Sequence, residues 1–114
     1  MTKIGFTGSR TLSQLNAEML LELAKIADEK GTIIHGGAIG ADELVDEFAY
    51  SVGINREVIR PISMSNKIDY LYRNVEIVAK ADRILAFWDG KSRGTKFTID
   101  YAKARGKEVK VVMF

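Results

Sequence analysis

Three short glycine-bearing runs lie at residues 6–10, 35–42 and 88–95 of this 114-residue chain. Each run follows a burst of apolar, often β-branched residues and precedes a stretch with helical periodicity. In a parallel sheet, such strand-to-helix turns lie on one edge, at the carboxyl ends of the strands. Glycine lets a ligand approach backbone N–H groups closely, and a helix N-terminus carries about half a positive charge. The pattern therefore predicts a pocket for a phosphate or a nucleotide.

The third run, residues 88–95, has the strongest features of an anion site. Gly90 and Gly94 free the backbone at a predicted helix start, where N–H groups are unpaired. The run and its flank also supply hydroxyls and positive charges: Lys91, Ser92, Arg93, Thr95 and Lys96. The alternative is a solvated loop whose glycines only make the turn, because the run matches neither a P-loop nor a complete Gly-x-Gly-x-x-Gly pattern.

The first run places Arg10 two residues past Gly8, with Ser9 between them. A guanidinium at this position can fork onto a phosphate or a carboxylate, which makes all three residues candidate ligand contacts. The alternative is an arginine that simply lies on the surface beside Ser9.

The second run contributes the candidate ligand residues Gly36, Gly37, Ala38, Gly40 and Asp42. Asp42 opens a predicted helix, where a carboxylate suits the helix dipole but repels a phosphate. We therefore expect Asp42 to cap the helix or to accept a hydrogen bond from a ribose hydroxyl. His35 ends the preceding strand and is either a ligand contact or proton carrier, or a histidine bonded to the neighbouring backbone.

Residues outside these segments also reach the predicted crevice. Arg73 and Asn74 fall off the apolar stripe of a predicted helix, so they are either ligand contacts or solvent-facing. Trp88 either stacks on a base or is buried under that helix, and Asp89 beside it is a candidate ligand contact. If the chain is an enzyme, four side chains are candidates for catalytic roles: His35, Asp42, Arg73 and Asp89.

Composition narrows the class of protein. The length suits one domain over residues 1–114, and 46% apolar with 28% charged residues is ordinary for a soluble globular protein. The absence of cysteine and the single histidine exclude disulfides, thiolate catalysis and Cys- or multi-His metal sites, and we expect neither a metal nor a cofactor. No apolar run approaches about 18 residues and no signal peptide is recognised, so we expect a cytoplasmic protein without a membrane span.

The apolar pattern predicts strands at residues 3–7, 32–35, 56–60, 83–88 and 108–114. It predicts intervening helices from an N-cap at Ser13 to about residue 30, at 42–52, up to about residue 81, and at 95–105. The third helix has its apolar face at Ile68, Leu71, Tyr72, Val75 and Ala79.

This alternation of strands and helices implies right-handed crossovers and a parallel sheet. We predict an α/β, Rossmann-like three-layer sandwich with a five-stranded parallel sheet in the order 3-2-1-4-5 and helices on both faces. This order puts the topological switch between the first and fourth strands, where the first and third runs meet. The final strand is apolar and lies at an edge, from which we infer a homodimer or higher homo-oligomer.

Taken in order, the motifs resemble the SLOG superfamily, and most closely its small YspA-like members of unknown function. The likeness covers nearly the whole chain and rests on residues 7–10, 35–38, 40–42, 73–74, 81–82, 86–90 and 92–95. The superfamily also includes the Lonely Guy phosphoribohydrolases, DNA-processing protein A and sensor domains of phage-defence systems. The resemblance implies a Rossmann-like fold that binds nucleotides or their derivatives at these loops.

One departure from the Lonely Guy pattern bears on activity. Those enzymes follow their final Gly-Thr motif with a catalytic glutamate, whereas Gly94-Thr95 is followed by no acid before Asp100. Arg73 matches their catalytic arginine only loosely. The resemblance therefore does not imply cleavage of an N-glycosidic bond by that mechanism.

Three functions follow from these observations. The first is binding of a nucleotide or nucleotide-derived ligand, as a sensor or sequestering domain. The second is a phosphoribohydrolase-like N-glycosidase with a non-standard acid or base in place of the glutamate. The third is single-stranded nucleic-acid binding, which the formal net charge of only +2 disfavours. That third function would use cations and stacking aromatics: Arg10, Lys91, Arg93, Lys96, Tyr70, Tyr72 and Trp88.

Overall fold

The computed structural model describes residues 2–114 as alternating strands and helices. The elements are β1 (Lys3–Gly8), α1 (Ala17–Asp28), β2 (Thr32–His35), α2 (Ala41–Val52), β3 (Asn55–Val58), α3 (Lys67–Lys80), β4 (Arg83–Trp88), α4 (Arg93–Ala104) and β5 (Glu108–Met113). Most ends agree with the sequence prediction within one or two residues, which is the usual scatter of helix and strand boundaries.

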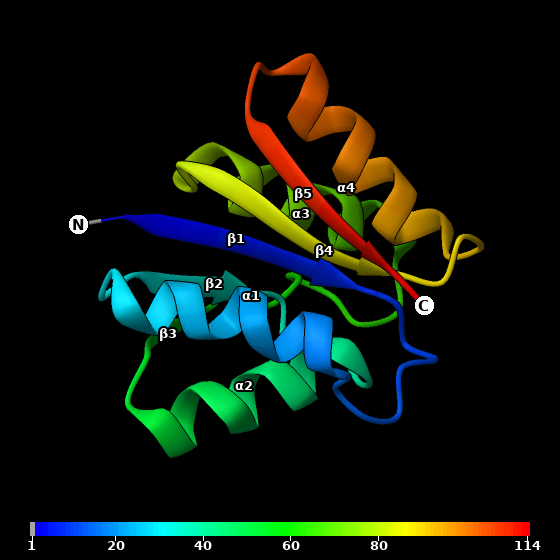
Figure 1. Cartoon of the computed structure of the whole chain (residues 1–114). Coiled ribbons are helices and arrows are strands. Elements are labelled where there is room, and N and C mark those ends of the chain that lie inside the picture. Colours follow the sequence, from blue (N-terminus) through cyan, green and yellow to red (C-terminus); the bar gives the residue numbers. More distant parts are fainter. Residues whose placement is uncertain (1) are drawn as a thin grey trace.

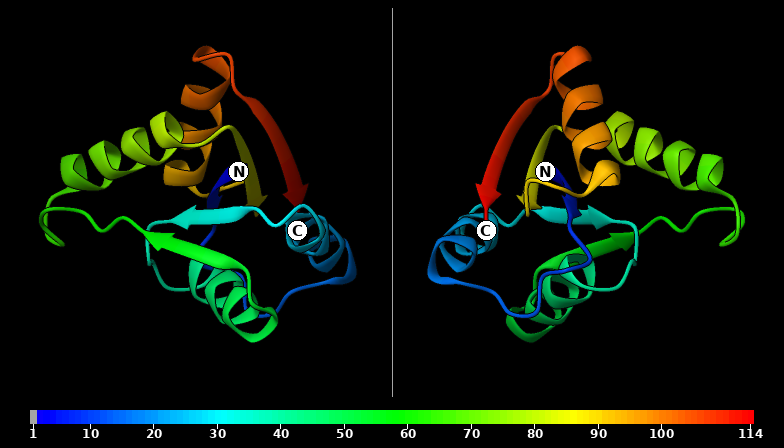
Figure 2. Two further views of the ribbon diagram at one scale, coloured as in Figure 1. Left: turned by 90° about the vertical axis from the view of Figure 1, so that its left-hand side faces the viewer. Right: turned by 90° about the vertical axis from the view of Figure 1, so that its right-hand side faces the viewer.

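The strands form one parallel sheet in the order β3-β2-β1-β4-β5, which confirms the predicted topology. Figures 1 and 2 show α1 and α2 on one face of the twisted sheet and α3 and α4 on the other. The carboxyl ends of the strands point the same way, toward the right of Figure 1. The loops that follow them therefore gather at one edge of the molecule.

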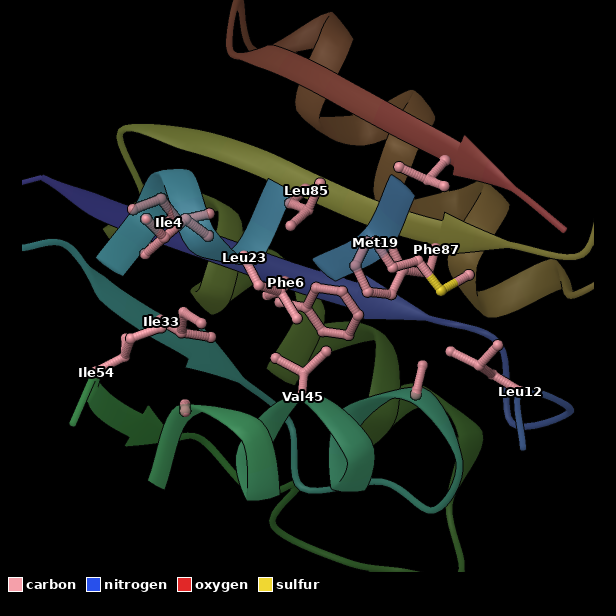
Figure 3. Close-up of a cluster of buried hydrophobic side chains, with 14 residues drawn as sticks. Ile4, Phe6, Leu12, Met19, Leu23, Ile33, Val45, Ile54, Leu85 and Phe87 are labelled. Atoms are coloured by element: carbon pink, nitrogen blue, oxygen red, sulfur yellow. The ribbon is translucent and has the colours of Figure 1, made fainter. Parts of the chain in front are cut away.

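The protein has a hydrophobic cluster on each face of the sheet, and the alternation of side chains along β1 explains why. Ile4 and Phe6 point toward α1 and α2 and lie in the larger cluster, which Figure 3 shows between the sheet and those helices. Phe6 meets Phe87 of β4 edge to face, with ring centroids 4.8 Å apart. Gly5 faces the other side, where a Cβ would lie 2.7 Å from Ile84 of β4 and 3.0 Å from Ile77 of α3. The lack of a side chain at Gly5 therefore lets α3 approach β1 closely.

Two predicted boundaries are wrong for local reasons. The N-cap of α1 is Asn16 and not Ser13, because the Asn16 side chain accepts a hydrogen bond from the amide of Met19 at 2.9 Å. Strand β3 ends at Val58, two residues before the predicted end at Arg60. The chain still follows β2 for one more step, since Ile59 donates to the carbonyl of His35 at 2.8 Å.

The predicted apolar face of α3 does not face the sheet. Ile68, Leu71 and Tyr72 are 55%, 37% and 66% exposed, while the same helix buries Arg73, Ile77 and Val78. The prediction was wrong because α3 carries apolar residues on two opposite sides, and helical periodicity alone does not say which side meets the sheet.

Among residues 2–114, none of the helices has both the length and the apolar character that crossing a membrane requires.

Candidate functional site

The three glycine-bearing turns meet around the buried residue Ser9. Its amide donates to the carbonyl of Phe87 at the end of β4, and its carbonyl accepts from Ala41 at the start of α2. Its hydroxyl accepts from the amide of Asp89 at 3.1 Å. Ser9 therefore joins the turns after β1, β2 and β4 into one edge, on the right of Figure 1.

The turn after β4 is closed by the carboxylate of Asp89. Its Oδ1 accepts from the amides of Lys91 and Ser92 at 2.8 Å each, and its Oδ2 accepts from the Thr11 hydroxyl at 2.8 Å. These hydrogen bonds, that of Ser92 foremost, hold the pKa of Asp89 well below its ordinary value. Two backbone amides of the predicted anion loop are thus already bonded to a carboxylate of the chain itself.

The first turn of α4 begins with backbone amides that its N-cap side chain does not cap. The amides of Arg93, Gly94 and Thr95 are those that a helix leaves without an acceptor of its own. In the described structure the Ser92 side chain caps none of them and lies 3.1 Å from the Thr95 hydroxyl. The indole of the half-buried Trp88 donates to the Ser92 carbonyl at 3.0 Å, which fixes the entry into the helix. This end of α4 suits an anion.

The turn after β2 is occupied by Asp42. One of its carboxylate oxygens accepts from the amides of Gly36 and Ala38, at 3.2 Å and 3.1 Å. Burial raises the pKa of Asp42, and the Ala38 amide, His35 and Arg73 oppose that rise. Asp42 therefore holds this loop in place of an external anion.

His35 is buried and uses both ring nitrogens within the protein. Its Nδ1 accepts from the amide of Gly37 at 3.0 Å, so Nε2 carries the proton and donates to Asp46 at 2.7 Å. Partial burial would raise the pKa of Asp46, but His35 and an ion pair with Arg56 hold it below its ordinary value. His35 is bonded to neighbouring backbone, which is one of the two alternatives that the sequence left open.

Arg73 reaches from α3 into the loop after β2. It is 8% exposed, its Nη1 donates to the carbonyl of Gly36 at 2.7 Å, and its Nε donates to Asn74 at 2.8 Å. Burial lowers the pKa of Arg73, while the nearby Asp42 charge raises it. Arg73 thus contacts the loop after β2, and Asn74 accepts a hydrogen bond from its guanidinium, so neither side chain faces only water.

Arg10 and Arg73 lie beside the same aromatic ring. The guanidinium carbons of Arg10 and Arg73 are 5.6 Å and 5.4 Å from the ring centroid of Tyr70, whose hydroxyl donates to the carbonyl of Met64 at 2.9 Å. The charge of Arg10 also contributes to lowering the pKa of Arg73. Two like charges thus converge here with no carboxylate at ion-pair distance from either guanidinium, which favours an anionic ligand.

Arg60 belongs to this edge and was missed from the sequence. It lies beside Gly37, whose carbonyl is 3.5 Å from its Nη1. Its position just past β3 was the signal that could have found it, because residues after parallel strands share one edge. Among residues 2–114, five cations of this edge form no ion pair: Arg10, Arg60, Arg73, Lys91 and Arg93. Within that range no cluster of carboxylates and histidine is arranged to hold a metal ion.

Similarity to known proteins supports the fold assignment. DNA processing protein A (DprA) from Streptococcus pneumoniae superposes with a TM-score of 0.82 at 17% identity, over 96% of this chain and 50% of that one. DprA from Helicobacter pylori gives 0.77 at 19% identity, over 96% and 64%. TM1055, a structural-genomics target, gives 0.74 at 24% identity, over 96% and 72%. The chain has a Rossmann-like fold.

One relative found by sequence has a higher identity than these structures, but the match covers a smaller part of this chain. The Gene 61 protein of Mycobacterium phage D29 is 34% identical over 83 residues, which are 65% of this chain and 65% of that protein. No family model matches the chain. The chain thus spans half of S. pneumoniae DprA and 65% of the phage protein.

Proposed function

We propose that this SLOG-type domain binds a nucleotide or nucleotide-derived ligand through its phosphate, as a sensor or sequestering domain. The observation that carries the proposal is the convergence of Arg10 and Arg73 beside Tyr70, with neither guanidinium paired to a carboxylate. The uncapped first turn of α4 lies on the same edge of the sheet.

The chemistry of these groups favours phosphate. Guanidinium groups bind phosphate oxygens through parallel N–H donors, and each charge-assisted hydrogen bond contributes about 1.5–3 kcal/mol. Several such bonds support a free energy of binding of about −8 kcal/mol, which corresponds to a micromolar dissociation constant. Tyr70 offers an aromatic surface at the same place for a base or ribose.

The contacts of the candidate acids and bases support binding over proton transfer. Asp42 and Asp89 each hold two backbone amides, and His35 is bonded at both ring nitrogens. A general acid or base must reach its substrate with a free oxygen or nitrogen. Asp89 and His35 use all their carboxylate oxygens and ring nitrogens within the protein, and Asp42 has only one oxygen outside its two amide bonds. The N-glycosidase alternative would therefore depend on that oxygen of Asp42 or on rearrangement of a turn, so we place it behind binding.

Isothermal titration calorimetry tests the proposal. The panel comprises nucleoside monophosphates, cyclic nucleotides, ADP-ribose and inorganic phosphate, each titrated into the wild-type protein and into Arg10→Ala. Arg105→Ala, an exposed arginine at the far end of α4, is the matched control. We expect a micromolar ligand whose affinity falls at least tenfold in Arg10→Ala and is unchanged in Arg105→Ala. The proposal fails if no compound binds more tightly than about 1 mM, the affinity that corresponds to only −4 kcal/mol.

Single-stranded DNA is the second candidate ligand. The fold is shared with two DprA proteins, and the H. pylori structure describes single-stranded DNA binding by that protein. The five unpaired cations of the edge, together with Tyr72 at 66% exposure, offer phosphate contacts and a stacking surface. Fluorescence anisotropy with a labelled oligothymidine at 50 and 200 mM salt tests this function. Tight binding that weakens steeply with salt supports it, and binding that ignores salt contradicts it.

A further inference from the structure

The peptide group between Gly36 and Gly37 is hydrogen-bonded at both of its ends. Its N–H, which belongs to Gly37, donates to Nδ1 of His35 at 3.0 Å. Its carbonyl, which belongs to Gly36, accepts from Nη1 of Arg73 at 2.7 Å. The N–H and C=O of a trans peptide point in opposite directions. This one peptide group therefore lies between His35 and Arg73 and connects them.

The peptide groups on either side of it are held in place, while the Gly36–Gly37 peptide itself has freedom to rotate. The amides of Gly36 and Ala38 both donate to one carboxylate oxygen of Asp42, at 3.2 Å and 3.1 Å. The rotating peptide has a glycine on each side, and glycine adopts φ of either sign. Gly37 has a φ of 69°, and a half-turn of the peptide brings it to negative values, which every residue adopts.

We propose that protonation of His35 flips the Gly36–Gly37 peptide and thereby frees Arg73 for an anion. Nδ1 of a histidine accepts a hydrogen bond only while it carries no proton. A proton on Nδ1 sets a donor against the N–H of Gly37, at a separation of 3.0 Å. A half-turn of the peptide removes this conflict, because the Gly36 carbonyl then faces Nδ1 and accepts from it. The same half-turn withdraws the carbonyl from Arg73 and presents the N–H of Gly37 there instead.

The flip changes the ligand site in favour of an anion. In the structure the Gly36 carbonyl takes up one donor of Arg73, whose side chain is buried. After the flip that donor is free, and a backbone N–H points to the same place, so one anion oxygen can accept from both. The added proton also brings a positive charge, so affinity for an anion rises as the pH falls. The inference rests on the proposed function, because it is the regulation of that same site.

Charged groups on three elements surround His35. Asp46 of α2 accepts from its Nε2 at 2.7 Å and is ion-paired with Arg56 of β3. Asp42, also of α2, interacts electrostatically with His35 and with Arg73 of α3. The two carboxylates offset the cost of placing a charge on a ring that is only 2% exposed. Histidine is the side chain that ordinarily changes charge between pH 5 and pH 8, so we look for the switch in that range.

Nuclear magnetic resonance without any ligand tests the flip itself. His35 is the one histidine of the chain, so the ring signals of an untagged, ¹⁵N-labelled sample have a single source. We expect the tautomer with the proton on Nε2 at pH 8 and a charged ring at pH 5. The amide signal of Gly37 should change with the same midpoint as the ring. The proposal is overturned if the ring of the folded protein stays neutral down to pH 5, or if the Gly37 amide does not follow it.

Titration with sulfate, followed by amide chemical shifts, tests the effect on the ligand site. Sulfate keeps its charge between pH 5.5 and pH 8, so a change in affinity comes from the protein. We expect wild-type affinity to rise about tenfold from pH 8 to pH 5.5. His35→Asn should abolish this rise, because its Oδ1 can accept from Gly37 as Nδ1 does but takes up no proton. A rise that survives in His35→Asn would assign the titration to another group, Asp42 first, and overturn the proposal.

Gly37→Ala should favour the flipped peptide without a proton. Alanine is disfavoured at a φ of 69° but not at the negative φ of the flipped state. A Cβ here lies 2.7 Å from Nη1 of Arg60, which is the end of an exposed side chain that can move away. We expect Gly37→Ala to bind sulfate at pH 8 about as tightly as the wild type does at pH 5.5. Weaker binding than the wild type at pH 8 would contradict the flip.

Gly53→Ala is the matched control for that variant. Gly53 also has a left-handed φ, of 80°, but it closes α2 on the opposite edge of the sheet, and a Cβ there meets no atom within 4 Å. The backbone strain is thus similar, and sulfate affinity should stay within twofold of the wild type. An equal change in both variants would assign the effect of Gly37→Ala to lost stability and overturn the proposal.

These measurements separate the regulation of the site from its existence. Sulfate that binds equally at both pH values leaves the proposed ligand site standing and overturns its control by His35. If sulfate binds at neither pH while the His35 ring and the Gly37 amide titrate together, the proposed site is overturned and the peptide flip is supported.

Discussion

Arg73 lies directly against the backbone of Gly36: its Nη1 donates to the Gly36 carbonyl, and a Cβ at Gly36 would lie 2.0 Å from that same nitrogen. The absence of a side chain at Gly36 is thus what admits the guanidinium. We predict that Gly36→Ala expels the end of the Arg73 side chain and leaves the carbonyl without its donor. The expected loss is about 1–3 kcal/mol of unfolding free energy, measured by urea denaturation, together with about a tenfold loss of phosphate affinity.

Gly94→Ala is the matched control for that substitution. A Cβ at Gly94 meets no atom within 4 Å, and alanine keeps the backbone amide in the first turn of α4. We expect this variant to gain about 0.5–1 kcal/mol of stability, because glycine weakens a helix relative to alanine, and to bind phosphate as the wild type does. An equal destabilisation by both substitutions would show that Arg73 is not the reason for glycine at position 36.

The topology could be predicted from the sequence because each glycine turn separates a short apolar strand from a helical repeat. Alternation of that kind leaves few arrangements open, and the parallel order followed from them. The orientation of α3 could not be predicted, because Ile68 and Tyr72 form as regular a stripe as the residues that face the sheet. Only tertiary packing decides between two apolar sides of one helix.

The sequence prediction also did not foresee that side chains of the chain itself bind the backbone amides of these turns. The glycine pattern predicted exposed amides after β2 and β4, yet Asp42 and Asp89 hold several of them. The position of Asp89, two and three residues before the amides it binds, is the signature of an Asx turn and was available in the sequence. The bond from Asp42 back to Gly36 spans six residues and depends on how α2 starts, so spacing alone does not reveal it.

Substitutions of Arg10 and Arg73 should differ in their effects on phosphate affinity and on the free energy of unfolding. Arg10 is exposed, so Arg10→Ala is expected to change the unfolding free energy by less than about 0.5 kcal/mol while it lowers phosphate affinity at least tenfold. Arg73 is buried and bonded, so Arg73→Ala is expected to lower both quantities. Urea denaturation and calorimetry with inorganic phosphate measure the two effects. If Arg10→Ala binds phosphate normally, the anion does not lie at Tyr70.

The protein should tolerate loss of the charge of Asp42, but not loss of the side-chain oxygen that accepts the two loop amides. Both loop amides donate to the same carboxylate oxygen, and an asparagine carbonyl in that place can accept both bonds. Because burial raises the pKa of Asp42, we expect Asp42→Asn to lie within about 1 kcal/mol of the wild type at pH 7. Asp42→Ala should cost about 1–3 kcal/mol, since it leaves two amides unpaired. Asp42→Asn should also bind inorganic phosphate at least as tightly as the wild type, because it removes any negative charge that Asp42 carries near Arg73. Weaker phosphate binding would contradict the assignment of Asp42 to the loop.

Asp89 should make the free energy of unfolding depend on pH in the acidic range. The amides of Ser92 and Lys91 hold its folded pKa below the ordinary value of 3.8, so the folded state keeps the carboxylate ionised where the unfolded chain takes up a proton. The stabilisation is complete above the unfolded pKa and is lost as the pH falls below it toward the folded value.

We therefore expect Asp89→Asn to lower the melting temperature at pH 7, and the difference from the wild type to shrink as the pH falls below about 4. Asp100→Asn is the control, because Asp100 is 59% exposed in a surface ion pair with Lys96, and such pairs contribute little. Differential scanning calorimetry between pH 3 and pH 7 measures both variants. A gap between Asp89→Asn and the wild type that stays constant over this range would show that the carboxylate charge does not stabilise the turn after β4.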